Sequence, residues 1–331
     1  MSAKGLRASL RAWGCSFVAV AGVLGFARTA SAQLPDMSKV EYRTEKLTDN
    51  LFVLFGGGGN IAVLTGSDGA LVVDSDVPDL SPKLRAALSL VTEKPARFLV
   101  NTHFHFDHTG GNPTLGRMGL VIIGHDNVRK RLMTRQVINL GQDLVFEPTA
   151  AEGWPVVTFA DGLSLHLNGE EVSVNHVANG HTDSDAFVFF EKANVLHTGD
   201  LMMSAGYPLI DLGNGGSIDG LIAGHERMLA LCNDQTRVIP GHGGMVAKAD
   251  LQAYHDMVVT VRKRVADLVR KGRSQQQVQA AAPSKEFDER WGKGFIKPEM
   301  FVDRLYIDLS RPRKKGLRRG RSAISAIRGP G

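Results

Sequence analysis

Long hydrophobic runs are absent from this chain of 331 residues. The longest apolar stretch begins at Trp13 and ends at Phe26, and it is shorter than the roughly 18 to 20 residues that a membrane-spanning helix needs. No later segment approaches that length. We therefore expect no transmembrane segment in the mature protein.

The apolar stretch has the flanks of a secretory signal peptide. Three basic residues precede it, and Ala30-Ser31-Ala32 follows it as a small-residue cleavage site. This arrangement is typical of a peptide that is removed on export. The sequence therefore predicts a signal peptide over residues 1–32 and a periplasmic or secreted protein.

Cysteine is nearly absent too. The sequence holds Cys15 and Cys232, and Cys15 lies within the predicted signal peptide. The one remaining thiol cannot form an intramolecular disulfide. We therefore expect core packing and bound metal to stabilise the protein.

Acidic residues are missing from both ends of the chain. Residues 1–32 and 311–331 carry basic side chains only, so acidic residues outnumber basic ones between them although the formal net charge is +5. An acidic body argues against a nucleic-acid substrate, and we expect a small-molecule substrate instead. Residues 311–331, basic and poor in apolar residues, are predicted to form a disordered tail. The sequence leaves the oligomeric state open.

Residues 33–310 are predicted to form one α/β domain. Short apolar strands alternate with glycine-rich turns, and Ser81-Pro82 opens a helix. The second half, which begins with the predicted strand 156–159, repeats this rhythm. Two β-rich halves, each covered by helices, predict a four-layer αβ/βα sandwich. The predicted strands are 51–55, 61–64, 70–73, 97–101, 156–159, 163–167, 172–177, 186–190, 195–198 and 237–239. The predicted helices are 81–92, one that begins at His125, 217–231 and 250–271.

Metal-binding residue types follow the strand 97–101 within six positions. Imidazole and carboxylate groups are usual zinc donors, and a turn at a strand end can aim several of them at one point. Three further donors follow other predicted strands, each beside a glycine. A lone histidine after a strand is usually structural, but three such positions behind one motif favour a shared centre. The donors are His103, His105, Asp107, His108, His181, Asp200 and His242.

These motifs occur in the same order as in the metallo-β-lactamase superfamily of metal-dependent hydrolases, which the sequence resembles over roughly residues 45–250. The resemblance implies the metallo-β-lactamase fold and two zinc ions, bridged by Asp200. Asp74 would orient a ligating imidazole from behind. Each ion would have three further ligands, which are His103, His105 and His181 for the first and Asp107, His108 and His242 for the second.

The resemblance also implies hydrolytic chemistry. Zinc lowers the pKa of bound water to about 7, so hydroxide is available as a nucleophile at neutral pH. Asp107 would orient that nucleophile and is the predicted catalytic residue. The expected reaction is hydrolysis of a small ester-, thioester- or amide-type bond. Mixed nitrogen and oxygen ligands admit iron or manganese as well as zinc.

Two interpretations of the substrate stay open. The sequence Thr198-Gly199-Asp200 favours the thioesterases and lactonases of the glyoxalase II-like branch, because zinc β-lactamases usually carry cysteine or serine near that position. The export signal instead favours a periplasmic enzyme that meets β-lactam-like rings. A redox-accessory or other non-hydrolytic role is disfavoured, because His105 stands where flavodiiron proteins carry glutamate.

Three segments are expected to shape the substrate site: residues 56–59, 140–154 and 202–216. Within them, Trp154, Met203 and Tyr207 are predicted to form an apolar wall over the metals. Among the remaining histidines, His125 begins a predicted helix, where capping the helix and contacting substrate are alternatives. His225 is expected to be a packing or solvent-facing residue.

Overall fold

The computed structural model describes residues 36–312. The predicted signal peptide over residues 1–32, and all but the first two residues of the predicted tail, lie outside the described residues. No helix among the described residues combines the length and the apolar character that crossing a bilayer requires.

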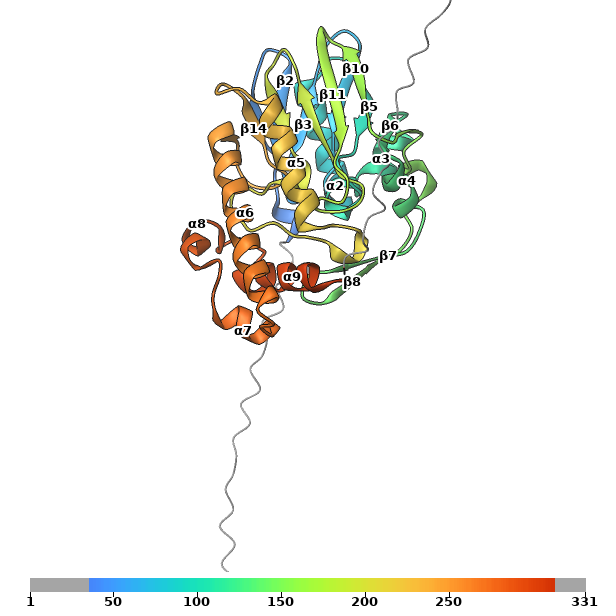
Figure 1. The fold of residues 1–331 in the computed structure, drawn as a ribbon. Helices are drawn as coiled ribbons and strands as arrows, with labels where there is room; N and C mark the ends of the chain where they lie inside the picture. Colours follow the sequence, from blue (N-terminus) through green and yellow to red (C-terminus); the bar gives the residue numbers. More distant parts are fainter. Residues whose placement is uncertain (1–35, 313–331) are drawn as a thin grey trace, which may run out of the picture. The chain divides into compact units, whose positions relative to one another are not determined.

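The first sheet has seven strands within the described part of the chain, in the order β1-β2-β3-β4-β5-β6-β9. Figure 1 labels β2, β3, β5 and β6 of this sheet. Strands β1 to β4 are antiparallel neighbours, as the short turns between them predict, and β5, β6 and β9 add in parallel. Parallel addition needs a crossover connection, and each of the three contains a helix: α1 (Ser81–Val91) between β4 and β5, α3 (Asn112–Arg117) between β5 and β6, and α4 (Asp126–Leu132) between β6 and β9. The strands are β1 (Arg43–Lys46), β2 (Leu51–Phe55), β3 (Ile61–Leu64), β4 (Ala70–Val73), β5 (Ala96–Val100), β6 (Val121–His125) and β9 (Val157–Phe159).

The second sheet follows the chain order from β10 to β15. Its strands are antiparallel neighbours except for β13 and β14, which run parallel. Helix α5 (Ile218–Leu231) lies in the connection between those two strands. The strands are β10 (Gly162–Leu167), β11 (Glu170–His176), β12 (Ala186–Phe190), β13 (Val195–His197), β14 (Arg237–Ile239) and β15 (Val246–Ala247).

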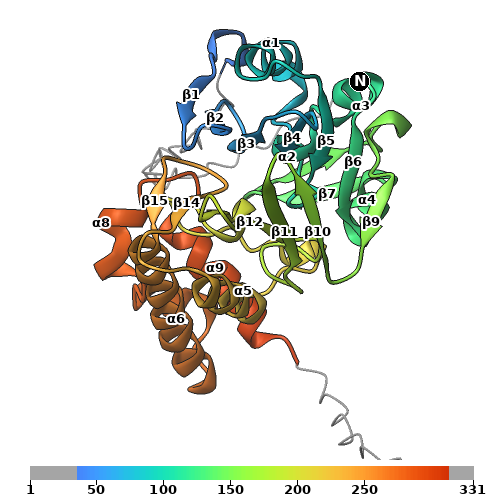
Figure 2. The ribbon, with the colours of Figure 1, turned by 90° about the horizontal axis from the view of Figure 1, so that it is seen from above.

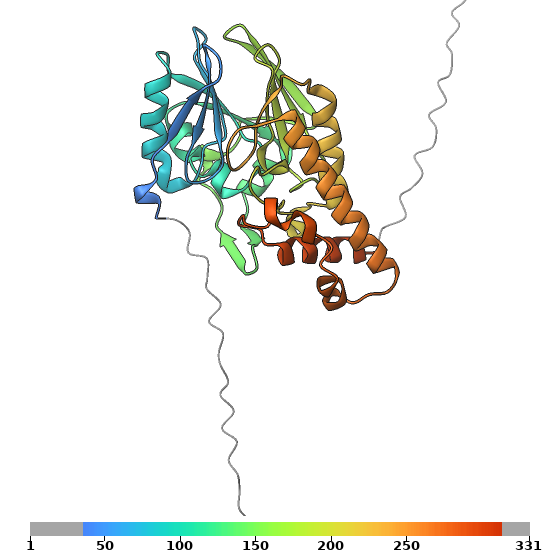
Figure 3. The same ribbon diagram turned by 90° about the vertical axis from the view of Figure 1, so that its left-hand side faces the viewer.

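The two sheets pack face to face, with helices on their outer sides (Figures 2 and 3). Between the sheets, Val53 of β2 and Val172 of β11 belong to one buried cluster. The next residue along β2, Leu54, faces the other way and packs with Leu84 of α1, because successive side chains of a strand point to opposite faces. A third buried cluster joins the second sheet to α5 and α6 (Lys248–Arg270). This arrangement confirms the predicted four-layer αβ/βα sandwich.

The assignment of the strand at 156–159 to the second half was wrong. Strand β9 pairs in parallel with β6, with Ile123 opposite Val157, and so completes the first sheet. The connection from β6 to β9 is a long crossover, which contains α4 (Asp126–Leu132) and a hairpin of β7 (Gln136–Asn139) and β8 (Asp143–Phe146). Because a crossover returns the chain to the sheet it left, the second sheet begins only at β10.

Three helices beyond α6 are absent from the sequence prediction. They are α7 (Gln275–Ala280), α8 (Asp288–Trp291) and α9 (Pro298–Ser310). Phe301 and Leu305 of α9 are buried in the same cluster as the apolar face of α6. Short helices of this kind gain most of their stability from tertiary packing, which a sequence pattern does not display.

A stacked histidine pair joins the two sheets near the start of α4. The His125 and His176 rings lie 3.7 Å apart at an interplanar angle of 7°. His125 takes the capping role, because its Nδ1 accepts a hydrogen bond from the backbone N–H of Asn127 at 3.2 Å. Its Nε2 donates to the carbonyl of Ala160. Burial, and in His125 also the neighbouring imidazole, lowers the pKa of both rings.

The lowered pKa values of His125 and His176 predict that the protein loses stability in mild acid. Both rings stay neutral in the folded protein, whereas the unfolded chain takes up protons below about pH 6.5, so falling pH favours unfolding. We expect the free energy of unfolding to drop between about pH 6.5 and 5, and His176→Gln to make that drop shallower. Urea unfolding at several pH values measures it. The exposed His166→Gln variant is the control, and equal slopes in all three proteins would contradict the prediction.

Candidate metal centre

The candidate donors lie beyond the carboxyl ends of strands in both sheets. Asp74 directly follows β4, and His103 lies three residues beyond β5. His181 follows β11, Asp200 lies in the short helix η4 (Gly199–Leu201) after β13, and His242 follows β14. Strand ends are rigid supports for converging side chains. The fold therefore brings together donors that are as far as 139 positions apart in the sequence, from His103 to His242, and places Asp74 beside them.

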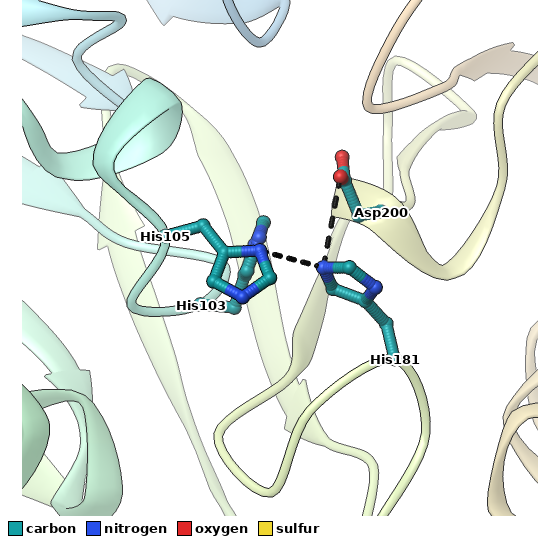
Figure 4. Close-up of side chains that lie close together, drawn as sticks. All are labelled: His103, His105, His181 and Asp200. Atoms are coloured by element: carbon teal, nitrogen blue, oxygen red, sulfur yellow. Dashed lines mark hydrogen bonds and ion pairs between the residues drawn. The ribbon is translucent and has the colours of Figure 1, made fainter. Parts of the chain in front are cut away.

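The first cluster contains His103, His105, His181 and Asp200, whose donor atoms all lie within 4.8 Å of one another (Figure 4). The Nε2 atom of His181 lies 2.9 Å from Nδ1 of His105 and 3.7 Å from Oδ2 of Asp200. All four residues are buried. Three imidazoles and a carboxylate oxygen facing one point form the donor set of a divalent metal site.

The second cluster contains Asp107, His108 and His242. The Nε2 atoms of the two histidines lie 3.3 Å apart, and Oδ2 of Asp107 lies 3.3 Å from Nε2 of His242. Asp200 reaches this cluster as well, because its Oδ1 lies 3.0 Å from Nε2 of His108 and 3.3 Å from Nε2 of His242. The Asp200 carboxylate thus faces the histidines of the first cluster through Oδ2 and those of the second cluster through Oδ1.

The structure therefore brings together all seven side chains that the sequence analysis named. Two observations fit metal binding. The Nε2 atom of His103 and the Oδ1 atom of Asp200 are buried without a hydrogen-bond partner among the described residues. Burial also lowers the pKa of His103 well below its usual range and, with the neighbouring His105, that of His181 to about 4. These rings are neutral, the form that ligates a metal. Their assignment as ligands stays a prediction.

The second cluster carries an excess of carboxylate groups. Burial opposes protonation of His242, but Asp200 and Asp107 raise its pKa to about 10. Burial likewise opposes ionisation of Asp107, but the imidazoles of His108 and His242 lower its pKa to about 2. The carboxylates of Asp74, Asp107 and Asp200 lie around the imidazoles of His108 and His242 and thus attract positive charge. A divalent cation would displace the protons held there, so acid should weaken its binding.

In His105, His108 and His181, the ring nitrogen that faces away from the clusters is held by a partner. Asp74 is fully buried, and one of its oxygens accepts a hydrogen bond from Nδ1 of His108 at 2.7 Å. It also accepts from the N–H and the hydroxyl of Thr102, both at 2.7 Å. The expected contact between Asp74 and a ligating imidazole is therefore present. Nδ1 of His181 donates to the carbonyl of Leu209 at 2.8 Å.

Asp211 is a candidate site residue that the sequence analysis missed. Its Oδ2 lies 3.0 Å from Nε2 of His105, which leaves Nδ1 of that ring facing the first cluster. Asn214 donates to the same carboxylate from its side chain at 2.7 Å. Burial raises the pKa of Asp211, but the His105 imidazole outweighs burial and holds it below its usual range. The contact spans 106 positions of sequence, and no local motif marks it.

Removing the Asp211 carboxylate should weaken the first metal site. We expect Asp211→Asn to bind zinc about 10- to 100-fold less tightly, because partners of ligating histidines fix the ring and raise its basicity. Competition against a chromophoric chelator measures the affinity. Asp256→Asn, which removes the carboxylate that lies 3.0 Å from Nδ1 of His255, a histidine outside the donor set, is the matched control. Equal affinity of wild type and Asp211→Asn would refute this role.

Two glycines give the ligands room. A Cβ atom on Gly59 would lie 2.3 Å from Cε1 of His108, and one on Gly241 would lie 2.1 Å from Oδ1 of Asp200. Both distances are too short for any side chain. The glycine loop 56–59 therefore contacts the second cluster directly, as its predicted position near the substrate site requires.

The prediction that Tyr207 forms part of an apolar wall over the metals was wrong. That side chain is fully buried in the core between the second sheet and the C-terminal helices. Its hydroxyl donates to Oδ1 of Asp288 at 2.9 Å, and its ring stacks on Phe301. Trp154 belongs to another apolar cluster, beside Phe104. Of the three predicted wall residues, Met203 lies near the centre, because its backbone forms an isolated β-bridge with that of His242. Tyr207 is thus a packing residue held by elements absent from the prediction.

His225 is a packing residue, as expected. It is fully buried in α5, and its Nε2 donates to the carbonyl of Leu201 at 2.6 Å. His197, next to the Asp200 segment, makes backbone contacts, with Nε2 donating to the carbonyl of Asn60 at 3.0 Å and Nδ1 accepting from the N–H of Gly199. Both rings support the strand ends on which the donors lie.

Comparisons with known proteins agree with this geometry. A model of the metallo-beta-lactamase superfamily matches residues 54–242. The chain is 24% identical over 237 residues to the human acyl-coenzyme A thioesterase MBLAC2, covering 62% of this chain and 83% of that protein. It is 22% identical over 225 residues to the beta-lactamase-like protein 2 homolog of Caenorhabditis elegans, covering 65% and 68%.

Solved structures of metallo-β-lactamases superpose on the chain. The DIM-1 metallo-beta-lactamase has a TM-score of 0.53 and 20% identity, covering 67% of this chain and 99% of that chain. A metallo-beta-lactamase from Pontibacter korlensis has a TM-score of 0.51 and 16% identity, covering 66% and 99%. At these identities the likeness shows the fold.

Proposed function

Because this chain belongs to the metallo-β-lactamase superfamily, whose model matches more than half of it, we propose that it is a dinuclear zinc hydrolase of small thioesters and related carboxylic esters. The observation that carries the proposal is the Asp200 carboxylate. One of its oxygens lies near His181 of the first cluster and the other 3.0 Å from His108 of the second. A shared carboxylate of this kind supports two ions close together.

The residues suit zinc, with His103, His105 and His181 around one ion, Asp107, His108 and His242 around the other, and Asp200 between them. When bound, such ions polarise a carbonyl oxygen and lower the pKa of water to about 7. Asp74 and Asp211 hold the ligating rings in one tautomer and one orientation. The chain thus supplies a rigid and largely buried set of donors.

Asp107 is the carboxylate best placed to act on an attacking water. It lies in the first turn of α2 (Phe106–Thr109), and 21% of its side chain remains exposed, whereas Asp200 is 4% exposed. Its low pKa keeps it ionised, so it can accept a hydrogen bond from water and orient the lone pair toward a substrate carbonyl. General-base positioning of this kind contributes about 10²- to 10⁴-fold to a rate.

The preference for a thioester over a β-lactam ring has two supports. The human relative is named as an acyl-coenzyme A thioesterase, and Asp200 stands in the position that favours the thioesterase and lactonase branches. The β-lactamases among the solved structures share the fold at 20% identity or less. Thioester hydrolysis is therefore the function that the site supports best.

A substrate panel tests this proposal. The zinc-loaded protein is assayed with hexanoyl-coenzyme A, a hexanoyl phenyl ester, a lactone and nitrocefin. We expect kcat/KM for the thioester to exceed that for nitrocefin by about 100-fold, since an activated acyl bond needs no ring-specific contacts. Nitrocefin turnover above thioester turnover would overturn the proposed substrate class, and zinc-to-protein ratios near zero would overturn the zinc assignment.

We also propose that the enzyme works outside the cytoplasm. The support is the sequence of residues 1–32, in which a basic start, a short apolar stretch and Ala30-Ser31-Ala32 follow one another. Expression in a Gram-negative host should yield a periplasmic protein whose N-terminal residue is Gln33. Mass spectrometry of the intact protein checks the cleavage position, and a chain that keeps Met1 and stays in the cytoplasm would contradict the prediction.

A further inference from the structure

We propose that a cavity between α2 and the β7–β8 hairpin binds an uncharged acyl or aryl arm of the substrate. This inference rests on the proposed function and names the part of the substrate that the protein selects. The cavity has a volume of about 260 Å³. Its apolar wall contains Pro78, Phe104, Phe106, Leu132, Ile138 and Phe146.

The cavity and the metal centre share one segment of chain. Phe104 and Phe106 line the cavity, while His105 between them and Asp107 after them belong to the two donor clusters. The Phe104 ring lies 4.6 Å from the His105 ring, centroid to centroid. The wall of the cavity is thus one ring away from a candidate ligand, on the same short segment that carries the predicted catalytic residue Asp107.

Aromatic rings give the cavity a defined shape. Phe106 of α2 stacks on Phe146 of β8 with a centroid distance of 4.6 Å and an interplanar angle of 17°. The hairpin itself is held from outside, because a guanidinium nitrogen of Arg304 in α9 donates to Oδ1 of Asn139 at 2.6 Å. A wall supported on both sides sets a limit to the length of the arm that fits.

The charges at the cavity are compensated. Two nitrogens of Arg131 donate to the two oxygens of Asp183, both at 2.7 Å, and a third donates to the side chain of Asn214 at 2.6 Å. The exposed Glu147 at the rim lies 3.7 Å from Arg135. A charged ligand group would find no free counter-charge among these residues, and burying it would be costly. The lining therefore selects an uncharged apolar group.

The volume also fits a part of a substrate. Sites for whole drug-sized ligands measure about 300–1,000 Å³, and this cavity is somewhat smaller. A carrier or leaving group would remain outside it. The rim includes exposed residues, Thr134 and Ala150 among them, so the cavity is open to solvent and an arm can enter without unfolding the hairpin.

Filling the cavity from its rim tests the proposal. Ala150→Phe adds a ring at a lining position, and Ala151→Phe adds the same ring to the next residue, which is also exposed but does not line the cavity. The zinc-loaded proteins are assayed with acetyl-, hexanoyl- and dodecanoyl-coenzyme A. In wild type and Ala151→Phe, we expect kcat/KM to rise about threefold per methylene from acetyl to hexanoyl and to fall again for dodecanoyl.

In Ala150→Phe, the ratio of hexanoyl to acetyl kcat/KM should drop at least about tenfold. Phe146→Ala enlarges the cavity, so it should move the optimum toward dodecanoyl. Circular dichroism and thermal melts establish that each variant folds. Chain-length profiles that coincide in all four proteins would overturn the inference while leaving thioester hydrolysis intact.

A binding measurement separates this inference from the proposed function. If wild type hydrolyses none of the acyl-coenzyme A compounds, the proposed function fails, and calorimetric titration with hexanamide then tests the cavity alone. The site would be supported if hexanamide binds wild type and Ala151→Phe, and binds Ala150→Phe at least about tenfold more weakly. Equal binding to all variants, or none to wild type, would overturn it.

Discussion

Asp107→Asn is expected to leave a folded protein whose kcat falls at least about 100-fold. The substitution keeps the shape of the side chain but removes its charge and one of its two acceptor oxygens. The remaining amide cannot take a proton from water and interacts more weakly with His242, which lies 3.3 Å from the carboxylate in the native protein. Steady-state kinetics with the best thioester of the panel measures the loss.

A matched control exists in another short helix, α4. Asp126 also lies in the first turn of a short helix whose N-cap is a histidine, His125, just as His105 precedes α2. Asp126→Asn therefore changes the same charge at the same kind of helix position, away from the donor clusters, and should keep activity within about twofold. Zinc analysis of both variants is essential. An Asp107→Asn protein with two zinc ions and wild-type kcat would refute the catalytic role.

Metal removal should lower thermal stability as well as abolish activity. A metal present at about 1,000 times its dissociation constant stabilises the folded state by about 4 kcal/mol, and for a protein of this size each kcal/mol shifts the midpoint by about 2–4 °C. We therefore expect a chelator to lower the midpoint by about 10 °C. The physical reason is the cluster itself, in which Nε2 of His103 is buried without a hydrogen-bond partner and carboxylates crowd together.

Differential scanning calorimetry measures this shift, and adding zinc after removal of the chelator should restore both midpoint and turnover. His181→Ala is the control for a direct effect of the chelator, because it has lost a ligand of the first site and should show a smaller shift. A midpoint that is the same with and without chelator, in protein shown to contain two zinc ions, would contradict the expectation.

Local pattern was sufficient for the fold class. In β2, alternate residues such as Val53 and Leu54 face opposite sides of the sheet, so hydrophobic runs between glycine turns predict sheet strands without reference to distant residues. The error at β9 arose because an irregular crossover with a hairpin looks, in sequence, like the start of a new unit. Which sheet a strand joins depends on pairing, and pairing is a long-range property.

The same division holds for the site. The sequence by itself singled out the seven candidate donors, because metal chemistry requires particular side chains and the strand ends that carry them have local signatures. Only the tertiary structure identified Asp211, which contacts His105 across 106 positions, and placed Tyr207 in the core with Asp288, 81 positions away. The cavity beside Phe104 and Phe106 was likewise not predictable from the sequence. A side chain's partners depend on how distant elements pack, and packing leaves no periodic mark in the chain.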